Sequence, residues 1–71
     1  MAEAVRAHIT GVVFQIVARA GTAVSAGDPL VILESMKMEI PVEAPRAGVV
    51  RELVVAEGQT VQEGDVVATL E

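Results

Sequence analysis

An all-β fold is the class that the sequence predicts, and three observations support it. Apolar residues gather in short runs, which glycine-containing turns separate at regular spacing. No segment shows sustained helical periodicity. The chain also repeats itself once without a gap. Many short strands between glycine turns indicate an antiparallel sandwich or barrel.

The internal repeat is clearest in the glycines. They recur at a constant separation of 37 residues, in the pairs 11/48, 21/58 and 27/64. Valines, leucines and Gly-Asp turns agree in the same register. Two copies in one short chain predict halves of about 5–34 and 42–71, related by a pseudo-twofold, each covering the other's apolar face. We also expect Gly11→Val or Gly48→Val to destabilise the fold, on the premise that these glycines adopt backbone angles closed to branched residues.

Individual strands can be placed from alternation and from proline. Pro29 suits the first residue of a strand, and Pro41 indicates a strand that lies at an edge or opens to solvent on its N–H side. The run 30–33 is apolar on both faces, so it lies between two sheets or contains a bulge, and its inward residues stay undecided. Val24 pins a short intervening segment to the core. The expected strands span 5–9, 12–18, 29–33, 39–43, 49–55 and 66–70.

Length and charge exclude several classes of function. The chain is long enough for one small domain, residues 1–71. It has no cysteine, which fits a reducing compartment, and its net charge of −5 opposes binding to nucleic acid or to an anionic membrane. It has neither a secretory signal nor an apolar run of the ~20 residues that a membrane helix needs. We therefore expect a cytoplasmic monomer.

The junction between the two copies contains the only lysine, Lys37, flanked by Met36 and Met38. Under twofold symmetry this junction lies at one end of the domain and the termini lie near the other, so Lys37 projects away from any tether. The alternative is an inert, solvated turn lysine. The methionines suit docking to several partners, and the alternative is that they fill gaps in the core.

The chemistry near Lys37 does not indicate an enzyme. A lysine amine is a nucleophile only when unprotonated, and Glu34 and Glu39 favour its charged form. His8 is the only histidine, and we expect it on the exposed face of a strand. We expect no catalytic residue and no metal site. Lys37 is better interpreted as an amine that another enzyme acylates, so that its flexible stem becomes part of a swinging arm.

The segment Glu34-Ser35-Met36-Lys37-Met38-Glu39 is similar to the Glu-Ala-Met-Lys-Met signature of the biotinyl/lipoyl attachment family, in its biotin carboxyl carrier branch. The Gly-Asp turns, the turn 44–48 and the two-copy layout resemble that family too, over nearly the whole chain. The resemblance implies a flattened β-barrel of two four-stranded antiparallel sheets. It also implies that a biotin protein ligase attaches biotin to Lys37. The biotin would then carry a carboxyl group from biotin carboxylase to carboxyltransferase in a biotin-dependent carboxylase of the acyl-CoA type.

The sequence departs from the family at several points. His8-Ile9-Thr10 replaces a proline-containing first turn, Ser35 replaces the commoner alanine, and Thr22 and Gln59 replace the usual aspartate. The ungapped repeat leaves no room for an inserted thumb. The chain is either a free-standing carrier or part of a larger enzyme. Two other functions remain open, a lipoyl carrier of the same fold and an unmodified β-module that acts as an adaptor.

Overall fold

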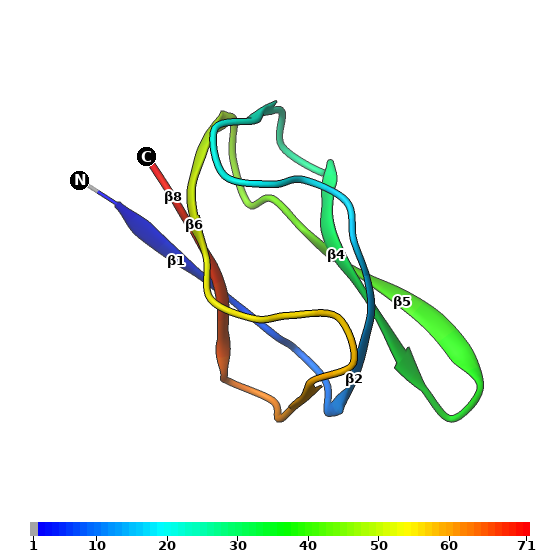
Figure 1. Ribbon diagram of the computed structural model, residues 1–71. Helices are drawn as coiled ribbons and strands as arrows, with labels where there is room; N and C mark the ends of the chain where they lie inside the picture. The colour runs from blue at the N-terminus through cyan, green and yellow to red at the C-terminus, as the bar shows by residue number, and fades with distance from the viewer. Residues whose placement is uncertain (1) are drawn as a thin grey trace.

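The computed structural model describes residues 2–71, which form two four-stranded antiparallel sheets and no helix (Figure 1). One sheet has the strand order β1-β8-β6-β3, and the other has the order β5-β4-β2-β7. None of the described segments is a helix of the length and hydrophobicity needed to cross a bilayer. The strands are β1 Glu3–Arg6, β2 Gly11–Ile16, β3 Ala23–Val24, β4 Pro29–Ser35, β5 Met38–Glu43, β6 Gly48–Leu53, β7 Thr60–Val61 and β8 Val66–Leu70.

The sequence repeat is also a repeat in space. Strands β2 and β6 begin and end 37 residues apart, and each occupies the same place in its own sheet. The same separation relates β3 to β7 and the start of β4 to the start of β8. Turns match as well: Gly64 donates its N–H to the carbonyl of Ala7 at 2.8 Å, and Gly27 donates to Ala44 at 2.9 Å. The pseudo-twofold predicted from the glycines is therefore present in the backbone.

The core lies between the two sheets and is aliphatic. Its most deeply buried side chains are three leucines and six valines, and no polar or charged residue among those described is buried with them. Valine and leucine fill this space without a polar group that would need a partner. The largest members are Leu30, Leu33, Leu70, Val13, Val31, Val42, Val50, Val61 and Val67.

All six expected strands are present, five of them with different ends. Pro29 starts β4, and Pro41 lies in the edge strand β5, as predicted. The register between β4 and β5 shifts between Pro29 and Val31, so the apolar run contains a bulge, and both Leu30 and Val31 are buried.

The first strand was expected at 5–9 and is found at Glu3–Arg6. It ends there because Ala7 leaves the ladder and donates its N–H to the carbonyl of Asp65 at 2.8 Å. His8 is exposed, but it lies in a bend and not on a strand. Strands β2 and β6 each end two residues earlier than expected.

Candidate functional site

A two-residue turn joins β4 to β5 and contains Lys37. The last strand pair is Ser35 with Met38, so Met36 and Lys37 form the whole loop. Both have positive φ, 53° and 64°, which is the conformation of a type I′ hairpin turn. Glycine or asparagine usually occupies such positions, because positive φ is costly for other L-residues. The hairpin therefore holds two long side chains in a backbone conformation that disfavours them.

All three side chains at the tip face solvent. Met36 is 91% exposed, Met38 is 62% exposed, and Lys37 is exposed too. The two ion pairs found in residues 2–71 are Glu3–Arg46 and Arg51–Glu71, so Lys37 belongs to neither. Because both methionines lie outside the core, the alternative that they fill gaps in it is wrong.

Two glutamates and a serine form the base of the turn. Glu34 lies directly opposite Glu39 across the β4–β5 ladder, and both are exposed. Like charges in this arrangement oppose pairing by roughly 0.2–1 kcal/mol. Ser35 is half-buried. Together with Lys37 and its methionines, these residues bring every predicted site residue onto one hairpin.

Gly11 was not among the predicted site residues, yet it helps to position this hairpin. A Cβ atom at Gly11 would lie 2.7 Å from the Glu34 carbonyl oxygen and 3.4 Å from Ser35 Cβ. The glycine therefore allows β2 to approach the end of β4 closely. The expectation of special backbone angles at Gly11 and Gly48 is wrong, because the positive-φ glycines are 21, 27, 58 and 64. Close approach of the backbone is the actual reason for glycine at both positions.

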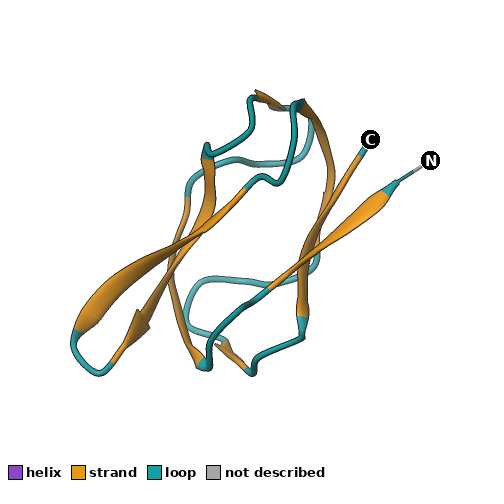
Figure 2. Cartoon of the chain, turned by 180° about the vertical axis from the view of Figure 1, so that it is seen from behind, coloured by secondary structure: helices purple, strands orange, loops and turns teal. Residues whose placement is uncertain are grey.

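The hairpin projects from the body of the molecule, on the side away from the termini (Figures 1 and 2). The chain measures 33 × 17 × 17 Å along its principal axes. The predicted separation of Lys37 from the chain ends is therefore confirmed. Side chains of the described residues form no cluster of three potential metal ligands. The fold and the hairpin thus define a small β-sandwich that presents one lysine side chain to solvent.

Comparison with known proteins agrees with this class. The family described as "Biotin-requiring enzyme" matches residues 1–70. A "Biotinylated protein TB7.3 homolog" of Mycobacterium leprae is 49% identical over 70 residues, covering 99% of both chains. A biotin carboxyl carrier protein of Streptococcus mutans is 41% identical over 64 residues, covering 90% of this chain and 49% of the relative.

A solved single-chain, multi-domain long-chain acyl-CoA carboxylase is similar in structure, with a TM-score of 0.90 and 37% sequence identity. The match covers 96% of this chain and 7% of the carboxylase. The chain belongs to the biotin/lipoyl attachment family and is a homologue of the biotin carboxyl carrier domains of biotin-dependent carboxylases.

Proposed function

We propose that Lys37 is the residue to which biotin is covalently attached, and that residues 1–71 form one carrier domain. The observation that supports this most directly is the position of the only lysine at the tip of a projecting type I′ turn, exposed and outside any ion pair of the described residues. A prosthetic group on this side chain has room on every side. The residues present therefore fit a covalently attached group.

Each part of the hairpin has a separate task in this proposal. The unprotonated Lys37 amine attacks an activated carboxyl group and forms an amide, the activating group leaves, and the nitrogen releases one further proton while keeping the other. Biotin, once attached, supplies a site that accepts and donates a carboxyl group. The two-residue turn limits backbone motion at Lys37, so the flexible stem of the side chain provides the swing. Met36 and Met38 offer adaptable apolar contacts to the enzymes that the arm visits.

The partner enzymes follow from the roles proposed for Lys37, the turn and the two methionines. We propose that a biotin protein ligase modifies Lys37, and that the arm then alternates between a biotin carboxylase and a carboxyltransferase, with an acyl-CoA as the acceptor. The chain itself contributes no catalytic group. Its lack of cysteine fits a cytoplasmic location.

The attachment site is tested with Lys37→Arg, which keeps the positive charge. The wild-type protein, incubated with a biotin protein ligase, biotin and ATP, should gain one biotinyl group, whereas Lys37→Arg should gain none. Intact mass spectrometry with peptide mapping measures this, and a lipoyl group would be recognised by its different mass. The modified protein should also migrate as one unit more acidic in native electrophoresis, because acylation removes one cation.

A second variant controls for position. Lys37→Arg combined with Arg51→Lys moves the only lysine to an exposed strand position, and it should remain unmodified. Biotin found on Lys37→Arg would show that the site lies elsewhere, and biotin found only on the double variant would show that the ligase does not require the hairpin tip. A wild-type protein that accepts no biotin would instead favour the unmodified adaptor.

A further inference from the structure

The two outer faces of the sandwich differ, although the repeat makes their positions equivalent. On the sheet β5-β4-β2-β7, the outward positions next to the hairpin include Phe14, Ile32 and Pro41. The equivalent positions in the repeat, 37 residues away, lie on the other sheet. They are occupied by Arg51, Thr69 and Ala4. The fold therefore accepts polar or small side chains at these places. The apolar residues on the first face are not required by the architecture.

Strand register places these apolar residues in one strip. Ile32 lies opposite Pro41 on β5 and opposite Gln15 on β2. The register of β2 shifts between Val13 and Gln15, so Phe14 is the extra residue of a bulge beside Gln15. Phe14 is 50% exposed although it is the only aromatic residue of the chain. Bulges are known to re-aim side chains, and this one directs a large ring towards solvent.

Val12 connects the strip to the hairpin. It is 39% exposed and lies opposite Glu34, which in turn lies opposite Glu39. Glu43, at the far end of β5, is exposed as well. The outward charges of β4 and β5 are thus three carboxylates. An apolar strip with an acidic border complements a surface with an apolar recess and a basic border.

The strip is close enough to Lys37 to belong to the same interface. Ile32 is three residues from the end of β4, a distance of about 10 Å along the strand. A standard interface buries about 800 Å² per partner, which corresponds to a disc of roughly 16 Å radius. An enzyme centred on the hairpin tip therefore covers the strip. Exposed aromatic residues in such positions commonly dominate binding.

The enzymes that act at Lys37 differ in how close their active sites must come to the turn. An unmodified lysine amine lies about 6 Å from its own Cα, from standard bond lengths. The enzyme that acylates it must bring its active site that close to the turn, and its surface must then lie along the hairpin. Enzymes that act on the longer, modified arm have no such requirement.

We propose that Val12, Phe14, Ile32 and Pro41 form the docking surface for the enzyme that acylates Lys37. This inference rests on the proposed function of Lys37. The matching surface of that enzyme is an apolar recess bordered by lysine or arginine. The strip determines how tightly the unmodified protein binds, and the hairpin presents the amine.

Matched variants on the two sheets test this proposal. Phe14→Gln and Val12→Thr should each lower kcat/KM for biotinylation, the former about tenfold and mainly through KM. Arg51→Phe and Val49→Thr change the equivalent positions of the other sheet and should stay within twofold of the wild type. Val49 is a suitable match for Val12 because it is 42% exposed. Thermal unfolding of each variant shows whether the fold is kept. We expect Phe14→Gln to fold, because the equivalent position of the other sheet is occupied by the polar residue Arg51.

Binding without turnover gives an independent readout. Titration of the ligase with the Lys37→Arg protein, with and without Phe14→Gln, should show about a tenfold weaker Kd for the double variant. Equal Kd values would overturn the proposal. It would also be overturned if Phe14→Gln only converted a dimer to a monomer in sedimentation, or impaired only carboxylation of previously biotinylated protein. Failure of the wild type to accept biotin would refute the proposed function instead.

Discussion

Thr69 has a buried hydroxyl oxygen without a hydrogen-bond partner, and it is the one side-chain atom of this kind found in residues 2–71. It lies opposite Ala4 and Glu52 on the two neighbouring strands, and neither residue forms a hydrogen bond with it. The equivalent residue in the first half is Ile32, which has no polar atom. The hydroxyl therefore lowers the stability of the folded protein, because it loses water and gains no partner.

Thr69→Val should raise the free energy of unfolding by about 1 kcal/mol, because it removes the unpaired hydroxyl and keeps the shape of the side chain. Urea denaturation measures the change. Thr60→Val is the control, since Thr60 is exposed, and it should shift stability by less than about 0.5 kcal/mol. A less stable Thr69→Val protein would mean that the hydroxyl has a partner in solution.

The β4–β5 hairpin contains unfavourable backbone conformations that are local to its turn. Met36→Gly should stabilise the protein by about 0.5–1 kcal/mol, because glycine relieves the positive φ and the 91% exposed side chain contributes little packing. Met38→Gly lies two residues away in β5 and should destabilise by a similar amount, since glycine weakens strands. Parallel thermal melts distinguish the two, and the same direction for both would contradict this account of the turn.

Gly11 and Gly48 begin the equivalent strands β2 and β6, but their surroundings differ. Gly11→Val should destabilise strongly, because its Cβ would lie 2.7 Å from the Glu34 carbonyl oxygen inside β4. Gly48→Val should cost less. Its Cβ would meet two atoms at 2.8 Å, the Glu71 carbonyl oxygen and Arg46 Nη1. Glu71 lies beyond the end of β8, and Arg46 Nη1 is the end of a flexible side chain, so both yield more easily than the backbone inside β4. Denaturation midpoints for the pair decide the matter, and equal midpoints would show that β4 yields as easily as Glu71.

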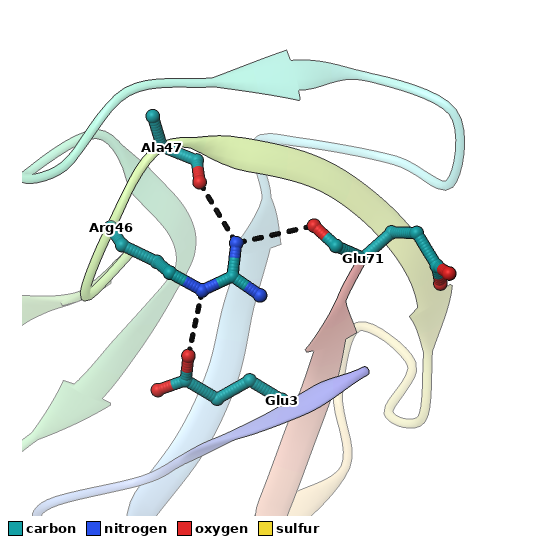
Figure 3. A network of polar contacts seen from close by, with 4 residues as sticks. All are labelled: Glu3, Arg46, Ala47 and Glu71. Carbon is teal, nitrogen blue, oxygen red and sulfur yellow. Dashed lines mark hydrogen bonds and ion pairs between the residues drawn. The ribbon is translucent and has the colours of Figure 1, made fainter. Parts of the chain in front are cut away.

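The end of the molecule opposite the hairpin is held by one arginine (Figure 3). Arg46 Nε donates to Glu3 Oε1 at 2.8 Å. Its Nη1 donates to the carbonyl oxygens of Ala47 at 2.9 Å and Glu71 at 3.2 Å. The contacts join β1, the turn before β6 and the residue after β8. Arg46 thus links three segments of the chain that lie far apart in the sequence.

Arg46→Gln should lower the melting temperature by several degrees. The Arg46–Glu3 pair is only partly exposed, at 39% and 47%, and pairs of this kind contribute up to about 1 kcal/mol, or roughly 4–8 °C in a domain of this size. Arg51→Gln is the matched control, because the Arg51–Glu71 pair is longer, 3.6 Å, and more exposed. Its melting temperature should not change measurably. High salt should reduce the effect of Arg46→Gln.

The amino-acid sequence alone is sufficient to predict the repeat, the alternation of strands and turns, and the position of Lys37 between the two copies. These features are local or periodic, so they can be recognised without knowing which strands pair. Glycine, proline and the 37-residue register were sufficient to place six of the eight strands and an exposed tip.

Other features depend on contacts between segments that are distant in the sequence. The bulges that bury both Leu30 and Val31 and expose Phe14 depend on the neighbouring strand, because one extra residue matters only against a partner. The end of β1 depends on Asp65, which is far away in the sequence. The reason for glycine at position 11 also came from a neighbour, the carbonyl of Glu34, since the residue type alone does not distinguish positive φ from close approach.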